Sequence, residues 1–339
     1  MRWILRGVCI CSILASVACV SKNSIKRDAV SMGETIPETI AKSYEVTEKP
    51  KVAAGVAGKL PTVLPEEALV AKPRPSRAKG KKETATQALT PAPSVVPNRR
   101  PPTERFRQGE RVLFDVTWLK SVAGELGLEV LPLKYIEGRK VYHFRGTART
   151  TSLVAAFYKA EDWVESFVDF LGLFPYKYVL HGDESKHIRD NLELFDHVKA
   201  KQYVYIKDDR LNGEIHEDKG IKDLTPFSQD SLSSLFYIRL LKLEDGKPET
   251  MSVATGGHMS DMKITALGRE DVRTKAGTFR CIKTNVQVNY KREKTFNENH
   301  FWFTDDDRRL LVKFEAKVRI GWLGGVAKSV DLGVPFSAE

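Results

Sequence analysis

The chain has 339 residues, of which 42% are hydrophobic and 29% charged, and its formal net charge at pH 7 is +10. Residues 20–104 hold fifteen Lys/Arg against nine Asp/Glu, and the first nineteen residues add two arginines. The remaining residues are close to neutral, which argues against a basic groove, so we expect no nucleic-acid partner.

The first nineteen residues, MRWILRGVCICSILASVAC, are typical of a secretory signal peptide. Arg2 and Arg6 precede an apolar run that is too short for a stable membrane span. The stretch Ser16–Cys19 resembles a bacterial lipobox, in which the cysteine is acylated after cleavage. We predict a signal peptide over residues 1–18, lipidation of Cys19, and a periplasm-facing protein anchored in the inner or outer membrane of a bacterial cell envelope. Ordinary cleavage after Ala18, without a lipid, is the alternative.

Residues 19–104 have the composition of a tether. They show no hydrophobic period, and eleven of the sixteen prolines fall between Pro37 and Pro102. Such a segment buries too little apolar surface to offset the entropy lost on ordering. We therefore predict a disordered tether over 19–104, with a coil span on the order of 50 Å, and one β-rich domain over 105–339.

Alternating patterns dominate that domain. In RVLFDVTWL, Val112, Phe114, Val116 and Trp118 alternate with polar or smaller residues, which predicts a half-buried strand. Similar patterns recur in residues 126–131, 162–170 and 278–290. One stretch differs: FSQDSLSSLFYIRLLKL repeats leucine and phenylalanine at helical spacing after two candidate N-cap residues, Ser228 and Asp230. The fold class is therefore predicted as mainly β, a curved antiparallel sheet or partly open β-barrel closed by one principal α-helix.

The stretch FWFTDDDRRLLVKFEAKVRIG, residues 301–321, places three aspartates between two alternating patterns. Aspartates favour turns because they bond to their own backbone. A Ca²⁺ site needs six or more oxygen ligands, and the DxDxDG spacing of an EF-hand is absent from this sequence. We predict that Asp305, Asp306 and Asp307 form a hairpin tip; a metal or acid–base site is the alternative.

The remaining polar residues do not form a common catalytic pattern. The sequence contains no HExxH, GxSxG or P-loop motif. In a strand, Glu165 and Asp169 share one face and Asp162 lies on the other, which favours ion pairs over an acid–base pair. Cys281 lies in a strand-like run and is expected to be packed rather than nucleophilic. We predict a protein that is not an enzyme, with no catalytic residues, metal or cofactor.

Five stretches occur in an order that is typical of one protein family: FRQGERVLFDVTWLKSVAGELGLEV, FYKAEDWVESFVD, FSQDSLSSLFYIR, REDVRTKAGTFRCIK and HFWFTDDDRRLLVKFEAKVRIG. Their order resembles the DUF3108 family, bacterial envelope proteins without an assigned biochemical function. The resemblance covers about Phe106 to Leu332. It implies an exported protein and a looser similarity to LolA-like lipoprotein-carrier folds, and it supplies no catalytic residues.

Two binding functions are compatible with a curved sheet. The first is a binding or structural interaction module that is held on the membrane by its acyl anchor and contacts a lipid or an envelope protein or glycan. The second is a periplasmic carrier or sensor of a hydrophobic ligand. An enzyme that modifies envelope glycan or lipid is a third alternative. The carrier would be lined by six aromatic residues, which could equally be ordinary core: Trp118, Trp163, Phe167, Phe301, Phe303 and Trp322.

Overall fold

A computed structural model describes residues 38–49, 96–119, 121–185, 187–210, 213–289, 299–317 and 321–337. The predicted signal peptide and the predicted lipidation site Cys19 lie outside the described residues, as do residues 50–95 of the predicted tether. Among the described residues, no helix is long and apolar enough to cross a membrane.

The described strands form one antiparallel sheet. Its order is β10-β11-β12-β13-β14-β15-β2-β3-β4-β5-β6-β7-β8-β9, and β1 pairs with β3 beside this path. The first strands in the chain are β1 (Val46–Thr47), β2 (Gln108–Trp118), β3 (Ser121–Ile136), β4 (Arg139–Thr150), β5 (Ala160–Asp169), β6 (Pro175–Glu184), β7 (His187–Asp196), β8 (Lys201–Arg210) and β9 (Ile215–Asp223). The remaining strands are β10 (Pro248–Thr255), β11 (His258–Thr274), β12 (Gly277–Asn289), β13 (Asn299–Thr304), β14 (Leu311–Lys317) and β15 (Trp322–Val334).

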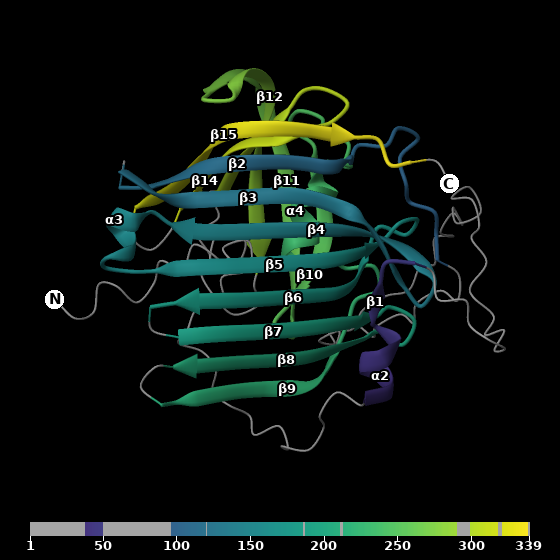
Figure 1. The fold of residues 1–339 in the computed structure, drawn as a ribbon. Coiled ribbons are helices and arrows are strands. Elements are labelled where there is room, and N and C mark those ends of the chain that lie inside the picture. Colours follow the sequence, from purple (N-terminus) through teal and green to yellow (C-terminus); the bar gives the residue numbers. More distant parts are fainter. Residues whose placement is uncertain are drawn as a thin grey trace, which may run out of the picture.

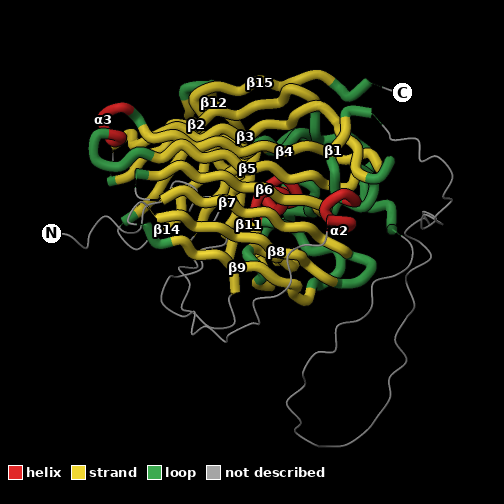
Figure 2. The backbone as a smooth tube through the Cα atoms, turned by 60° about the horizontal axis from the view of Figure 1, so that its bottom comes forward, coloured by secondary structure: helices red, strands yellow, loops and turns green. Residues whose placement is uncertain are grey.

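The sheet folds over on itself instead of closing. Figure 1 shows β15 and β2 to β9 as one layer, with β10 to β14 behind it, and Figure 2 shows the same arrangement from below. The end strands β9 and β10 do not pair with each other within the described residues. Helix α4 (Ser231–Ile238) lies between the layers, because it contacts β4 and β5 on one side and β10 on the other. The predicted fold class is confirmed.

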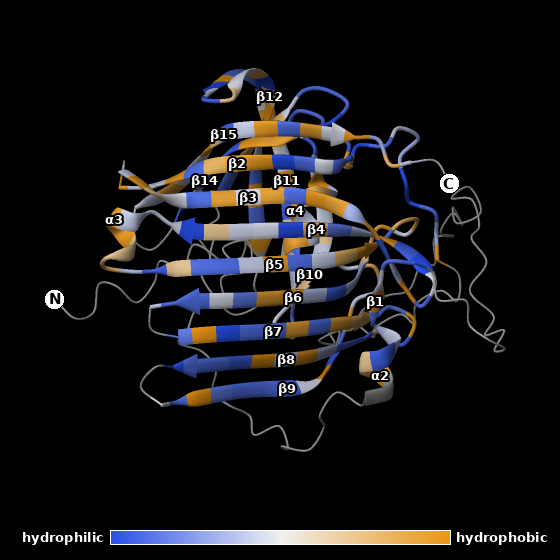
Figure 3. Ribbon diagram, in the orientation of Figure 1, coloured by the Kyte–Doolittle hydropathy of each residue, from blue (hydrophilic) through white to orange (hydrophobic). Residues whose placement is uncertain are grey.

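Alternation explains which strand faces are buried. In β14, Val312, Phe314 and Ala316 are buried, whereas Lys313 and Glu315 are partly exposed. Figure 3 shows the same mixture of hydrophobic and hydrophilic residues along the strands of the front layer. Because successive side chains point to opposite faces, one face can enter the core while the other meets solvent.

Helix α4 begins where the sequence predicted. Asp230 is its N-cap: the carboxylate accepts hydrogen bonds from the backbone N–H groups of Leu232 and Ser233, and the Ser233 hydroxyl accepts from the Asp230 N–H. This reciprocal capping box satisfies N–H groups that have no partner inside the helix. The helix ends at Ile238, earlier than the leucine spacing suggested, and Leu243 is nevertheless buried.

Two described segments fall inside the predicted tether, residues 38–49 and 96–104. The first contains helix α2 (Glu38–Ser43) and β1, and Tyr44 Oη donates a 3.1 Å hydrogen bond to the Phe195 carbonyl. In the second, Val96 is buried and the Arg99 N–H donates to the Leu171 carbonyl at 2.9 Å. These two segments are ordered, whereas the sequence predicted disorder. A few isolated residues hold them to the domain, and isolated residues create no hydrophobic period that the sequence analysis could detect.

Candidate functional site

The space inside the folded-over sheet is occupied by side chains around α4. Phe236 of α4 stacks on Phe144 of β4 with ring centroids 4.0 Å apart, and Phe106 meets both rings edge-on. A cavity of about 20 Å³ lies between α4, β2 and β14 and is bordered by Glu110 and Arg239. It is large enough for about one water molecule, whereas pockets for small-molecule ligands measure roughly 300–1,000 Å³. A hollow of about 460 Å³ lies elsewhere, on the surface beside α2, and Lys177 borders it.

The six aromatic residues predicted to line a ligand site do not come together. They are Trp118, Trp163, Phe167, Phe301, Phe303 and Trp322. Phe301 and Phe303 lie in the main core, and Trp118 is partly buried against it. Phe167 belongs to a separate small cluster, and Trp322 is 43% exposed.

The orientation of β5 explains why Trp163 and Phe167 lie apart from the other predicted residues. Val164 and Val168 face the main core. Trp163 and Phe167 therefore lie on the opposite face, since neighbours along a strand alternate. On that face the Trp163 ring lies 5.9 Å from the ring of His181. The sequence of β5 is apolar on both faces, with Trp163 and Phe167 on one and Val164 and Val168 on the other, so it gives little indication of which face is inside.

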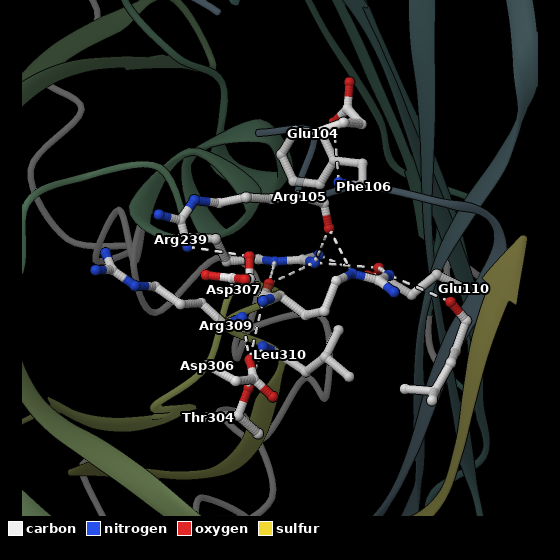
Figure 4. Close-up of polar contacts among 12 residues, drawn as sticks. Glu104, Arg105, Phe106, Glu110, Arg239, Thr304, Asp306, Asp307, Arg309 and Leu310 are labelled. Atoms are coloured by element: carbon white, nitrogen blue, oxygen red, sulfur yellow. Dashed lines mark hydrogen bonds and ion pairs between the residues drawn. The ribbon is translucent and has the colours of Figure 1, made fainter. Parts of the chain in front are cut away.

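A buried cluster of charges lies at the end of α4 (Figure 4). Glu110 of β2 is 3% exposed, and its Oε1 accepts a 2.6 Å hydrogen bond from Arg239 Nη1. Its Oε2 accepts from Arg239 Nη2 at 3.1 Å and also from Arg308 Nη2. Arg239 Nη2 donates in addition to the carbonyls of Arg105 and Arg308, each at 3.0 Å. The cluster therefore joins α4, the chain before β2 and the turn before β14.

The three aspartates form the turn between β13 and β14, as predicted. Asp306 Oδ1 accepts hydrogen bonds from the backbone N–H groups of Arg308 and Arg309, at 2.9 and 2.8 Å (Figure 4). Asp305 Oδ2 lies 3.0 Å from Arg269 Nε. No group of three or more His, Cys, Asp or Glu side chains is placed to hold a metal ion within the part of the chain that the structure describes. The turn is held by backbone and arginine contacts.

Two buried carboxylates have raised pKa values. Asp230 also accepts from the Ser166 hydroxyl, and burial raises the pKa of its carboxyl to about 6. Glu193 of β7 is fully buried, and burial raises the pKa of its carboxyl to about 7. Sequence reasoning missed Glu193, because it lies within an ordinary alternating strand pattern.

Glu193 connects distant parts of the folded-over sheet. The Gly256 N–H, in the turn between β10 and β11, donates to both of its carboxylate oxygens at 3.0 Å. Asn191 Nδ2 donates to Oε1 at 2.7 Å, and Gln202 Nε2 donates to Oε2. Gly256 and Gly257 have φ values of +58° and +74°, which suit a tight hairpin turn and favour glycine. The turn therefore packs its backbone against the inner face of β7.

The other predicted residues behave as structural groups. Glu165 and Asp169 share one face of β5, where Glu165 lies 3.8 Å from Arg145 Nε and Asp169 lies 2.6 Å from Arg139 Nη2. These ion pairs confirm the predicted role of the two carboxylates. Cys281 is fully buried, as predicted, and burial is the main cause that raises the pKa of its thiol to about 12.

The fold and its interior define a class: an antiparallel β-protein whose open sheet folds over one short, buried helix. Within this class, the sequence profile of the family described as "Protein of unknown function (DUF3108)" matches residues 113–325, which is more than half of the chain. The chain therefore belongs to the DUF3108 family. No curated protein gives a significant match.

Three solved structures show distant similarity. A β-barrel-like DUF1849 protein from Brucella abortus shares 10% identity, with a TM-score of 0.44 over 67% of this chain and 98% of that chain. A Bacteroides fragilis protein with a YmcC-like fold shares 11% identity, with a TM-score of 0.29 over 66% and 96%. A candidate lipoprotein from Parabacteroides distasonis shares 9% identity, with a TM-score of 0.30 over 66% and 95%. These similarities are too distant to assign a function.

Proposed function

We propose that this protein is a lipid-anchored cell-envelope protein, acylated at Cys19, whose tethered β-domain acts as a binding or structural interaction module. The observation that supports it most is the packed interior, in which Phe144, Phe236 and Phe106 occupy the space around α4. Since the cavity beside them measures about 20 Å³, we expect partners to bind the outer surface. The lipobox-like residues before Cys19 support the anchor.

Metabolic labelling with a palmitate analogue tests the anchor. The full-length protein should incorporate the label, and Cys19→Ser should lose it. Cys281→Ser is the matched control and should keep the label, because its thiol is buried. Label that persists in Cys19→Ser would disprove the anchor.

Cross-linking in intact cells tests the interaction module. Photo-reactive residues on the outer face of the domain should give discrete adducts with an envelope protein or glycan. The carrier alternative instead requires a lipid inside the sheet. Adducts formed only with lipid, from positions that face α4, would contradict the proposed module and favour the carrier.

A further inference from the structure

Exposed apolar side chains gather at one end of the sheet. We call this set the apolar rim and define it as Leu119, Val122, Leu153, Phe157 and Trp322. These side chains are between 43% and 79% exposed. Isolated exposed hydrophobic residues are common, whereas a group of them on neighbouring segments marks an interaction site.

Three successive strand connections build the apolar rim: β14 to β15, β2 to β3, and β4 to β5. They are neighbours, because Leu323 of β15 pairs with Trp118 of β2, and the Thr151 N–H donates to the Ala123 carbonyl at 3.0 Å. With strands about 4.8 Å apart, the apolar rim extends for roughly 20 Å. Figure 1 shows the ends of β2 and β3 beside helix α3 (Ser152–Ala155) at the left edge of the sheet, and Figure 3 shows hydrophobic residues on α3.

The local conformations present apolar side chains to solvent. Leu119 has φ +49°, in the left-handed region that disfavours leucine, at the tip of the β2–β3 connection. Leu153 lies in α3 and Phe157 follows two residues after its end, and both side chains are more than three-quarters exposed. None of the residues of α3 is buried. Leu119 and Phe157 are therefore both left exposed on the surface of the domain.

The composition of these connections indicates what would cover them. The described residues of these connections, 118–119, 121–123, 150–159, 317 and 321–323, contain two lysines, Lys159 and Lys317, and no Asp or Glu. Lys317 Nζ lies 5.8 Å from the centre of the Trp322 ring, whereas Lys159 pairs with Asp183. Tryptophan, phenylalanine and leucine with nearby cations are the side chains that enter the headgroup region of a bilayer.

The apolar rim also has a defined orientation in the sheet. Strand β14 begins next to the acidic turn at residues 305–307 and ends at Lys317, beside Trp322. The acidic turn therefore lies at the opposite end of β14 from the apolar rim. At the rim end, the carboxylates of Glu161 and Asp183 are paired with Lys159, and Lys317 beside Trp322 is placed to meet an anionic headgroup.

We propose that the apolar rim is a membrane-contact edge that inserts its side chains among the headgroups of a bilayer containing anionic phospholipid. The inference rests on the proposed function, in which an acyl anchor and a tether keep the domain near a membrane. The edge would dock the domain onto that surface and fix its orientation.

Vesicle sedimentation tests the membrane-contact edge independently of the anchor. The probe is the mature chain, residues 19–339, with Cys19→Ser, mixed with vesicles of phosphatidylethanolamine and one-quarter phosphatidylglycerol. Relative to this protein, Leu153→Ser/Phe157→Ser should bind about tenfold more weakly or worse. The matched control is Val198→Ser/Leu332→Ser, which removes two exposed apolar side chains at the opposite ends of the strands and should bind normally.

Tryptophan fluorescence supplies a second readout. Vesicles should shift the emission to the blue, and Trp322→Phe should remove most of that shift while leaving the far-UV circular dichroism spectrum unchanged. Equal binding of the rim and control variants, or equal binding to pure phosphatidylcholine, would overturn the proposal. Self-association abolished by the rim variant, without any vesicle binding, would instead assign the rim to a second copy of the chain. Palmitate labelling at Cys19 is unaffected by any of these outcomes, so the two proposals fail separately.

Discussion

At the scale of single residues, Arg239 is a buried cation whose guanidinium makes several hydrogen bonds. It is 3% exposed and bonds to Glu110, while its guanidinium also reaches the carbonyls of Arg105 and Arg308. A buried charge without its partner is costly, whereas an exposed ion pair contributes little. The stability of the domain should therefore depend strongly on this one guanidinium.

Arg239→Ala should lower the free energy of unfolding by about 3–5 kcal/mol, because Glu110 would keep only Arg308 as an ion-pair partner among the described residues. Urea unfolding followed by circular dichroism measures this change. Arg280→Ala removes an exposed partner of Asp271 and serves as the control, for which we expect little change. A similar loss of unfolding free energy in both variants would show that the buried ion pair of Arg239 contributes no more to stability than the exposed pair of Arg280.

Asp306 should matter more than its two neighbours. Its carboxylate accepts the N–H groups of both Arg308 and Arg309, so Asp306→Ala should lower the free energy of unfolding by about 1–2 kcal/mol. Asp307→Ala should have a smaller effect. Thermal unfolding with and without Ca²⁺ completes the test: a rise in Tm with Ca²⁺ that Asp306→Ala abolishes would indicate a metal site instead of a turn.

At the scale of elements, the β10–β11 hairpin is held against β7 by Glu193. Burial raises the pKa of Glu193 to about 7, and hydrogen-bond acceptors for its protonated form lie nearby. These are the amide oxygens of Asn191 and Gln202, which are buried and have no hydrogen-bond partner among the described residues. Either oxygen could accept a hydrogen bond from the O–H of a protonated Glu193 after a local rearrangement. The contact with Gly256 is thus compatible with both protonation states.

Glu193→Gln should change how stability depends on pH. The folded protein binds the Glu193 proton up to about pH 7, whereas the unfolded chain releases it near the ordinary value of 4.5. The contribution of this group is therefore fully present below about pH 4.5 and is lost as pH rises to about 7, a change of about 3 kcal/mol. We expect the difference in unfolding free energy between the native protein and the variant to fall across this range and to level off above it. A constant difference would contradict the raised pKa.

The alternating patterns predicted strands and their hairpins because burial of one face imposes a period of two, and the acidic turn followed from the same patterns. The helix was predicted from its leucine spacing and its cap at Asp230. The inward face of β5 could not be predicted, since Trp163 and Val164 are both apolar. The link from Glu193 to Gly256 depends on how the whole sheet folds over, which no local pattern records.

At the scale of the whole molecule, the open sheet is stabilised by three tertiary connections. The α4 cap joins the helix to β5 through Ser166, the Arg239 cluster joins it to β2 and the β13–β14 turn, and Glu193 joins β7 to the β10–β11 hairpin. Because side chains are packed around α4, the function proposed above assigns binding to the outer surface. The apolar rim is the part of that surface whose chemistry best fits a membrane.

Native mass spectrometry of the protein isolated from its own envelope in mild detergent tests the central claim most directly. The account predicts the mass of the chain from Cys19 onward plus covalent acyl groups, with no stoichiometric non-covalent lipid, because the cavity beside α4 measures about 20 Å³. The Cys19→Ser variant should lack the acyl mass. A lipid that remains bound in this variant at one copy per chain, and is lost when Phe236 is enlarged to tryptophan, would contradict a packed interior and identify a carrier.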